Sequence, residues 1–263
     1  MTRLLTLCGL VATLAAPAVA AAGKKAPAAP GPSAAKIVEQ NVKARGGLKA
    51  WQAVATLKLS GEVDAGGTSD ARLPFVLSMK RPHKSRMELT FGGKNAVQAY
   101  DGAQGWKVRP FLNRDDVEPY TVAEARSAAA TDELDGPLVD YASKGTQIEK
   151  VGTEVVEGKR TYKLQLKAKS GEERFVWIDA KTFLEAKITG EPRKLDGRTH
   201  RVALYYRDYR TVDGLKIPHV METVVDGVRK SHKMIIKTVT VNPALDDALF
   251  AKPRGAVAKA AGG

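Results

Sequence analysis

The feature that most constrains this 263-residue chain is a series of short segments in which apolar and polar residues alternate. The segments TLKLSGEV (56–63), RLPFVLSMKR (72–81) and SRMELTF (85–91) each carry apolar side chains at every second position. Because successive side chains of a β-strand point to opposite faces, this period of two predicts strands with one apolar face and one solvent-exposed polar face. Strands of this kind pair mainly antiparallel, in a sheet that is covered on one side.

Alternation or short apolar runs return along most of the chain, at residues 97–100, 106–110, 148–151, 162–166, 175–177, 184–188, 202–206, 215–225 and 231–241. The sequence therefore predicts a mainly β fold with some α-helix, built on about eleven mostly antiparallel strands. A sheet of that size does not pack flat; it curls, and the curl encloses either its own side chains or a ligand.

The N-terminal part of the domain has helical rather than strand periodicity. Ser33 is placed to cap a first helix, which ends at Gly46-Gly47. A short helical turn follows at residues 48–54, and its Trp51 is interpreted as a core anchor that holds this region against the sheet.

A second helical region interrupts the strands at residues 121–144. Thr121 and Glu124 have the spacing of a capping box, and the alanines that follow favour helix. Gly136-Pro137 breaks this helix, and a second short helix is expected to carry Leu138, Val139 and Tyr141. We expect this insertion to be helical and to lie over the sheet.

The stretch AYDGAQGWKVRPF (99–111) reads as a hairpin. Asp101 precedes Gly102 in the turn and can bond the turn backbone, so we interpret it as a turn residue rather than a catalytic acid. On the returning strand, alternation puts Trp106 on the face opposite Lys107 and Arg109. We expect the two cations outside and Trp106 inside.

The ends of the chain have their own composition. Arg3, the apolar run after it and Ala18-Val19-Ala20 have the pattern of an export signal, with cleavage expected after Ala20 or, as second choice, Ala22. Cys8 is badly placed for lipid attachment and leaves with the signal, which excludes disulfides and thiolate chemistry from the mature chain. The expected divisions are a signal peptide (1–20), a disordered Pro/Ala-rich linker (21–35), one domain (36–253) and a disordered tail (254–263).

The chain is strongly basic, with a formal net charge of +13. Such a charge favours anionic partners, among them the head groups of a membrane surface, although it also serves solubility alone. Nucleic acid is not expected as a partner, because the sequence has no recognition-helix, zinc-finger or RNP-type pattern and carries an export signal.

The sequence offers little for catalysis or for a metal ion. None of the four histidines shares a local metal-binding spacing, although His200, His219 and His232 could meet across strands. Adjacent acids such as Asp115-Asp116 fall in expected loops or helix starts, and no phosphate-binding, dinucleotide-binding or nucleophile-elbow motif is present. We therefore expect no catalytic residues, no metal and no cofactor.

Apolar and aromatic side chains on one face of the sheet are the abundant feature. Nine of them are expected to face its concave side and to bind lipid: Phe75, Leu77, Met79, Met87, Leu89, Phe91, Tyr100, Trp106 and Trp177. The pattern alone leaves two alternatives open, because these side chains either line a cavity or pack against the helices as a filled core.

Several motifs in order resemble the periplasmic LolA/LolB-like lipoprotein-carrier superfamily, and in particular its outer membrane lipoprotein-sorting members. They are RGGLKAWQAVATLKLSGEV, YDGAQGW, FVWIDAKTFLEAKI, YYRDYRTVDGLKIPHVMET and LDDALF, and the resemblance covers residues 36–253. It implies an unclosed antiparallel half-barrel with helices as a lid over an apolar cavity. In LolA itself an arginine near the lid helps to hold the closed state; no single arginine of this chain is assigned that role.

The resemblance implies a periplasmic carrier that binds acyl chains, of lipoproteins or of free lipid, for transport towards the outer membrane. The basic charge adds the expectation of transient contact with an anionic membrane surface, and we expect a monomer. The alternative is a non-enzymatic envelope module with a filled core that binds anionic surfaces.

Overall fold

The computed structural model describes residues 31–64, 72–110, 114–131 and 133–253. The expected signal peptide, the first ten residues of the expected linker and the expected tail lie outside the described residues. In the described part, no helix has the length and apolar character needed to cross a membrane.

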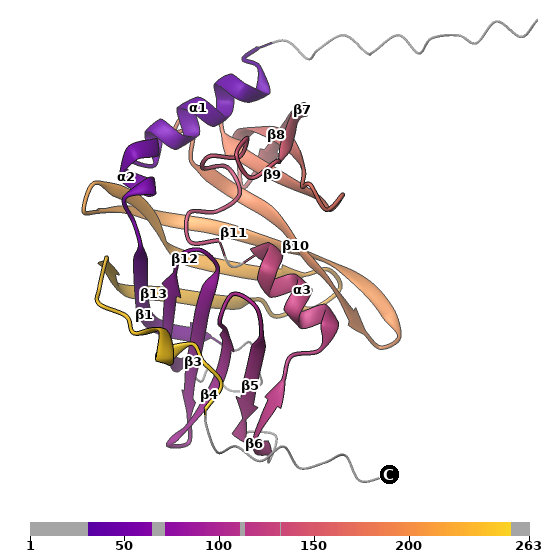
Figure 1. The fold of residues 1–263 in the computed structure, drawn as a ribbon. Helices are drawn as coiled ribbons and strands as arrows, with labels where there is room; N and C mark the ends of the chain where they lie inside the picture. The colour runs from indigo at the N-terminus through magenta and orange to yellow at the C-terminus, as the bar shows by residue number, and fades with distance from the viewer. Residues whose placement is uncertain (1–30, 65–71, 111–113, 132, 254–263) are drawn as a thin grey trace, which may run out of the picture.

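The described residues form one antiparallel sheet of 13 strands that curls without closing (Figure 1). The strand order is β6-β5-β4-β3-β2-β1-β13-β12-β11-β10-β9-β8-β7, so the first strand of the chain lies beside the last one and joins two meanders. In chain order the strands are β1 (Thr56–Asp64), β2 (Arg72–Lys80), β3 (Lys84–Phe91), β4 (Lys94–Tyr100), β5 (Gly105–Arg109), β6 (Arg114–Pro119), β7 (Gln147–Val156), β8 (Lys159–Lys167), β9 (Glu173–Asp179), β10 (Glu185–Leu195), β11 (Arg198–Val212), β12 (Leu215–Val225) and β13 (His232–Val241).

The prediction of a curled, mainly β half-barrel with helices is confirmed, with three differences in detail. The sheet has 13 strands instead of about eleven, and β6 includes Asp115 and Asp116, which the sequence places in a loop or at a helix start. The second short helix after Gly136 is absent from the described residues, which form hydrogen-bonded turns at 139–145 instead. Left-handed backbone at Asp140 (φ 53°) is incompatible with a continuous helix there.

The N-terminal helices form as expected. Helix α1 (Ala34–Ala44) is capped by Ser33, whose hydroxyl accepts a hydrogen bond from the Lys36 amide at 3.2 Å, and it therefore begins two residues before the expected domain boundary at 36. Helix α2 (Leu48–Gln52) contains Trp51, which is 1% exposed and belongs to the main core cluster. The interpretation of Trp51 as a core anchor is confirmed.

The two sides of the sheet are covered differently. We call the face that carries Leu57, Leu59 and Leu77 the inner face; α1, α2, helix α3 (Val122–Thr131) and residues 133–145 pack on this side (Figure 1). A β-bulge at Ser60/Gly61 bends the central strand β1 against β13. A Cβ atom at Gly61 would lie 2.0 Å from the Ile235 carbonyl oxygen, so this close approach requires glycine.

The hairpin at residues 99–111 and the C-terminal segment also form as expected where the structure describes them. The Asp101 carboxylate accepts hydrogen bonds from the amides of Ala103 and Gln104 at 2.8 and 2.7 Å, which confirms its interpretation as a turn residue. At the other end of the chain, a 3-10 turn η2 (Asp247–Leu249) places Phe250, which is fully buried, against the sheet.

Candidate functional site

A cavity of about 540 Å³ lies between the inner face of the sheet and the part of the chain that crosses this face, which is helix α3 and residues 133–138. This volume is within the range of small-molecule binding sites, roughly 300–1,000 Å³. The strands contribute mostly apolar side chains to its wall: Leu57, Leu59, Leu77, Met79, Met87, Val176, Ile188, Ile217, Met221 and Ile236. Gln98, which is exposed, also lines the cavity, so the cavity reaches solvent beside β4.

Strand register explains why the apolar wall is continuous. Leu59 of β1 lies opposite Leu77 of β2, and Leu77 lies opposite Met87 of β3. Residues that face one another across an antiparallel pair share a face, so these three side chains form one row. Leu57 of β1 and Met79 of β2 also lie opposite each other, and they form a second row beside the first.

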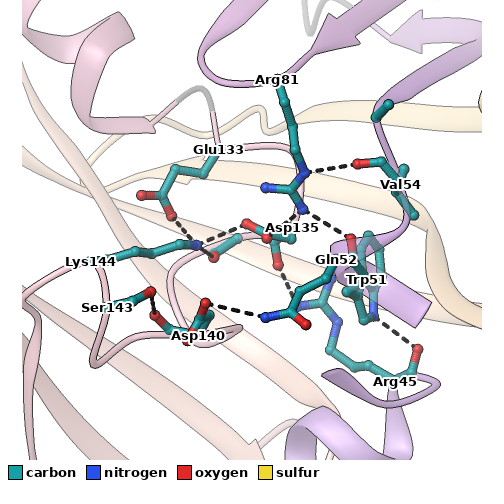
Figure 2. Close-up of polar contacts among 12 residues, drawn as sticks. Arg45, Trp51, Gln52, Val54, Arg81, Glu133, Asp135, Asp140, Ser143 and Lys144 are labelled. Atoms are coloured by element: carbon teal, nitrogen blue, oxygen red, sulfur yellow. Dashed lines mark hydrogen bonds and ion pairs between the residues drawn. The ribbon is translucent and has the colours of Figure 1, made fainter. Parts of the chain in front are cut away.

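Residues 133–145, which we call the lid segment, are held in place by the polar contacts of Asp135 (Figure 2). The Asp135 carboxylate accepts hydrogen bonds from Arg81 at 2.7 Å and from Lys144 at 2.8 Å, and its backbone carbonyl accepts one from Arg45 at 2.8 Å. Arg81 is itself fixed, because its guanidinium also donates to the carbonyls of Trp51 and Val54. The lid segment is thus tied to α1, α2 and the end of β2.

Asp135 is charged in this setting. Burial acts to raise its pKa, but the hydrogen bonds from Lys144 and Arg81 outweigh burial and hold the pKa of Asp135 below the ordinary Asp value. Its side chain is only 4% exposed, so both cations face a carboxylate that water barely reaches. The contact stabilises the position of the lid segment over the cavity at neutral pH.

Helix α3 is attached to the sheet by a second ion pair. Lys107 of β5 points to the inner face and donates to both Glu124 carboxylate oxygens, at 2.5 and 2.7 Å. Glu124 also accepts from the Thr121 amide at 2.8 Å, while the Thr121 hydroxyl accepts from the Glu124 amide, which confirms the capping box. Burial acts to raise the pKa of Glu124, but these partners hold it below its usual value.

One end of the cavity is polar. Arg45, at the C-terminus of α1, pairs with Glu185 of β10 at 3.2 Å, and its guanidinium lies 4.4 Å from the centre of the Trp51 ring. The Tyr209 hydroxyl is 3.2 Å from a carboxylate oxygen of the same Glu185. Together with Tyr206, these residues form what we call the polar end of the cavity.

Two backbone irregularities bring the polar end together. A β-bulge between Glu185 and Lys187 of β10 keeps Glu185 on the inner face, although Ile188 three residues later also faces inward. Strict alternation would likewise put residues 206 and 209 of β11 on opposite faces. Asp208 between them is left-handed (φ 52°), and both tyrosines line the cavity.

The nine residues expected to bind lipid divide into three groups. Leu77, Met79 and Met87 line the cavity. Phe75, Leu89, Tyr100 and Phe91 share the inner face with them by register but stand outside the cavity wall: Phe75 and Tyr100 are buried, Leu89 packs on the core, and Phe91 is 54% exposed. Trp106 and Trp177 lie on the outer face.

The expected inward orientation of Trp106 is wrong. Its cross-strand partner is Ala99, and its indole nitrogen donates to the Phe250 carbonyl at 2.9 Å on the outer face. The expectation failed because it assumed that a lysine could not face inward. Glu124 of α3 neutralises Lys107 there, and this leaves the outer position to Trp106, which the C-terminal segment covers.

Trp177 also points away from the cavity, contrary to the expectation. The inward positions of β9 belong to Val176 and Ile178, which pack in the second core cluster. The Trp177 ring is covered on the outer face by Lys163 and Lys187, and its nitrogen donates to Glu154 at 2.7 Å. The run FVWID is apolar at successive positions, so its alternation did not identify the inner side.

The structure separates the three histidines that the sequence left as a potential cluster. His200 contacts the Asp226 carbonyl in a hairpin, whereas the buried His219 contacts the Ile217 carbonyl. Within the described ranges, no group of three or more His, Cys, Asp or Glu side chains is placed to hold a metal ion.

Sequence reasoning missed the polar end and most of β11 to β13. Ile217, Met221 and Ile236 follow the alternation of their strands, so that pattern could have identified them. Arg45, Glu185 and Tyr209 had no such signal, because a helix end, a bulge and a left-handed residue place them.

Comparisons with known proteins bear on the fold. A family model described only as an uncharacterized protein matches residues 138–254. No curated protein sequence matches the chain significantly.

Solved structures of the same architecture include a LolA superfamily protein from Nitrosomonas europaea, with 12% identity over 84% of this chain and 99% of that one and a TM-score of 0.56. A domain of an outer membrane lipoprotein-sorting protein from Vibrio parahaemolyticus has 12% identity, coverage of 82% and 94%, and a TM-score of 0.54. A DUF1329 family protein from Desulfovibrio piger has 13% identity, coverage of 83% and 97%, and a TM-score of 0.57. The chain therefore has a LolA-like fold.

Proposed function

We propose that this protein is a non-enzymatic carrier that binds lipid acyl chains, of lipoproteins or of free lipid, in the cavity of its half-barrel. The observation that carries the proposal is the cavity itself: an apolar wall of strand side chains beneath a lid segment held by Asp135. The likeness to LolA superfamily structures supports the same function. The protein would act in the periplasm, exported by its N-terminal signal, and deliver its cargo towards the outer membrane.

The physical basis for acyl chains is the character of the wall. Each methylene transferred from water to such a wall contributes about 0.8 kcal/mol, so a chain of ten or so carbons is retained without a specific polar contact. Met79, Met87 and Met221 add flexible side chains that can adapt to chains of different shape. The alternative of a filled core is less well supported, because these side chains leave a cavity.

Mass spectrometry of lipids that copurify with the protein from its own cell envelope tests the proposal. A blocked variant makes the test specific: in Leu77→Trp an indole projects from β2 into the cavity, and we expect at least a 10-fold loss of copurifying lipid. Val76→Trp is the matched control, because Val76 is the neighbouring half-buried residue on the other face of the same strand. Equal lipid content in the two variants would argue against the cavity as the binding site.

The same proposal includes contact with an anionic membrane surface, and one end of the sheet is suited to it. The hairpin of β10 and β11, at the right of Figure 1, and the neighbouring β12–β13 turn carry exposed cations: Arg193, Lys194, Arg198, Arg201 and Arg229. Leu195 and Val228 beside them are 38% and 39% exposed. Cations flanking exposed aliphatic side chains favour an anionic bilayer surface over a neutral one.

A further inference from the structure

The polar end of the cavity contains one hydroxyl that the protein does not use. Tyr206 of β11 lines the cavity, and within the described part of the chain no hydrogen bond joins its hydroxyl to another group. Tyr209, by contrast, is held by Glu185. The Tyr206 phenol therefore offers a hydrogen bond at the polar end of the cavity, and a ligand or water can accept it.

The charges around Tyr206 are already balanced. Arg45 and Glu185 pair at 3.2 Å, with both side chains about 10% exposed, and Arg45 also donates to the Asp135 carbonyl. A carboxylate or phosphate entering this end would lose its water and would meet Glu185, while the charge of Arg45 is already opposed by Glu185, even though the buried Nε–H of Arg45 has no acceptor among the described residues. A neutral acceptor avoids both penalties.

The tyrosine also stays protonated. Burial, followed by the nearby Glu185 charge, raises the pKa of Tyr206 above its ordinary value, so the hydroxyl remains a donor throughout the neutral range.

We propose that Tyr206 donates a hydrogen bond to the neutral carbonyl of an esterified acyl chain, and that the cavity selects acyl esters over free fatty-acid anions. This inference rests on the proposed carrier function and adds a ligand class and a selecting residue. The acyl chain lies along the apolar rows of β1 to β3, and its ester group lies at the polar end beside Arg45 and Glu185.

Displacement of N-phenyl-1-naphthylamine, a neutral apolar fluorophore, tests the selection. Two ligands share a twelve-carbon acyl chain: 1-monododecanoylglycerol carries a neutral ester and dodecanoate, at pH 8, carries a charge. We expect the ester to displace the fluorophore at a concentration at least about 10-fold lower than dodecanoate, because desolvating the carboxylate is costly.

Two matched variants assign the effect to Tyr206. Tyr206→Phe removes only the hydroxyl, and the concentration of ester needed should rise about 5-fold while that of dodecanoate stays unchanged. Tyr205→Phe makes the same chemical change on the outer face, where Tyr205 packs under Lys187 and Arg207, and both ligands should behave as with the native protein. Glu185→Gln leaves Arg45 without its carboxylate, so dodecanoate should bind about 10-fold better.

The outcomes separate this inference from the carrier function. Equal displacement by both ligands, or identical behaviour of Tyr206→Phe and Tyr205→Phe, would overturn the selection while leaving a carrier of acyl chains. A native protein that binds neither the fluorophore nor either ligand would overturn the carrier function, and the inference with it.

Discussion

Trp106 shows how a single partner decides which way a strand side chain points. Its ring is 3% exposed, its nitrogen is bonded to the Phe250 carbonyl, and the Arg86 guanidinium lies 5.3 Å from the ring centre. All of these contacts are on the outer face, away from the cavity. The residue therefore contributes to stability and not to the binding wall.

Replacement of Trp106 by alanine should test this role. We expect Trp106→Ala to lower the free energy of unfolding by about 3–5 kcal/mol, as large aromatic truncations do, because the ring is buried and the C-terminal segment loses its contact. Urea denaturation measures the loss. Under conditions where the variant is folded, its affinity for N-phenyl-1-naphthylamine should equal that of the native protein; a reduced affinity with unchanged stability would instead place Trp106 at the ligand.

At the level of single residues, the sequence predicted the side chains whose neighbours follow a regular pattern. Leu77, Met79 and Met87 alternate cleanly with polar residues, and they line the cavity as alternation requires. Trp106 and Trp177 were misplaced because their faces depend on contacts distant in sequence. Glu124 lies 17 residues from Lys107, and the covering segment at Phe250 lies 144 residues from Trp106.

Among the elements, the lid segment depends most on charge. Asp135 joins it to Arg81 of the β2 end and to Lys144 of the segment itself, and the carboxylate is almost fully buried. Removal of that carboxylate takes a buried counter-ion from both cations, although Lys144 keeps Glu133 at 2.9 Å and Arg81 keeps the two backbone carbonyls to which it donates. The fold of the sheet is not required to change, because both strands of the β2–β3 hairpin remain paired.

Asp135→Asn should therefore loosen the lid segment at neutral pH. We expect a loss of about 2 kcal/mol in the free energy of unfolding, the size typical of hydrogen bonds to charged groups, and faster hydrogen exchange in residues 133–145. Asp115→Asn is the control, since the Lys94–Asp115 pair is exposed on both sides and should contribute little. Equal effects of the two substitutions would contradict the role of Asp135.

The pH dependence follows from the lowered pKa of Asp135. A carboxyl with a depressed pKa in the folded protein contributes stability above its unfolded pKa, about 3.9, and loses that contribution as pH falls through the folded value. Urea denaturation of the native protein and of Asp135→Asn at a series of pH values should show their difference constant above pH 5 and shrinking below pH 4. A difference that grows in acid would be incompatible with this role of the Asp135 carboxylate.

The elements themselves were largely predictable, and their irregularities were not. Ser33, the Thr121/Glu124 capping box and the period of two gave the helix starts and most strands, because each signal is local. Strand β6 was not predicted, because its sequence RDDVEP is mainly polar and lacks alternation. It belongs to the sheet through its backbone pairing with β5. The bulge before Lys187 and the left-handed Asp208 carry no clear sequence signal, yet they assemble the polar end of the cavity.

On the scale of the whole molecule, the distribution of charge matters more than its total. The formal net charge is +13, but many cations of the described residues are paired, such as Arg174 with Glu172 and Glu191. Arg193, Arg198 and Arg229 are exposed at one end, beside Leu195 and Val228. This is the end that the proposed contact with a bilayer surface would use.

Charge reversal at this end should separate local attraction from net charge. We expect the native protein to sediment with vesicles of phosphatidylglycerol and phosphatidylcholine at low salt and to dissociate as salt is raised, because screening weakens attraction between exposed charges. The triple variant Arg193→Glu, Arg198→Glu, Arg229→Glu should bind these vesicles at least about 10-fold more weakly, given about 1 kcal/mol per cation near an anionic surface.

The control triple, Lys49→Glu, Lys159→Glu, Lys181→Glu, makes the same change in net charge at exposed positions in α2, at the start of β8 and in the turn after β9, at the opposite end of the sheet. It should retain most of the vesicle binding, because charge that is farther from the bilayer than a Debye length, about 8 Å at physiological salt, contributes little. Equal losses in the two triples would mean that total charge alone drives association. Retained binding in the first triple would remove the β10–β11 hairpin as the docking surface, whereas a loss confined to that triple would orient the half-barrel on the membrane with this hairpin towards the lipid.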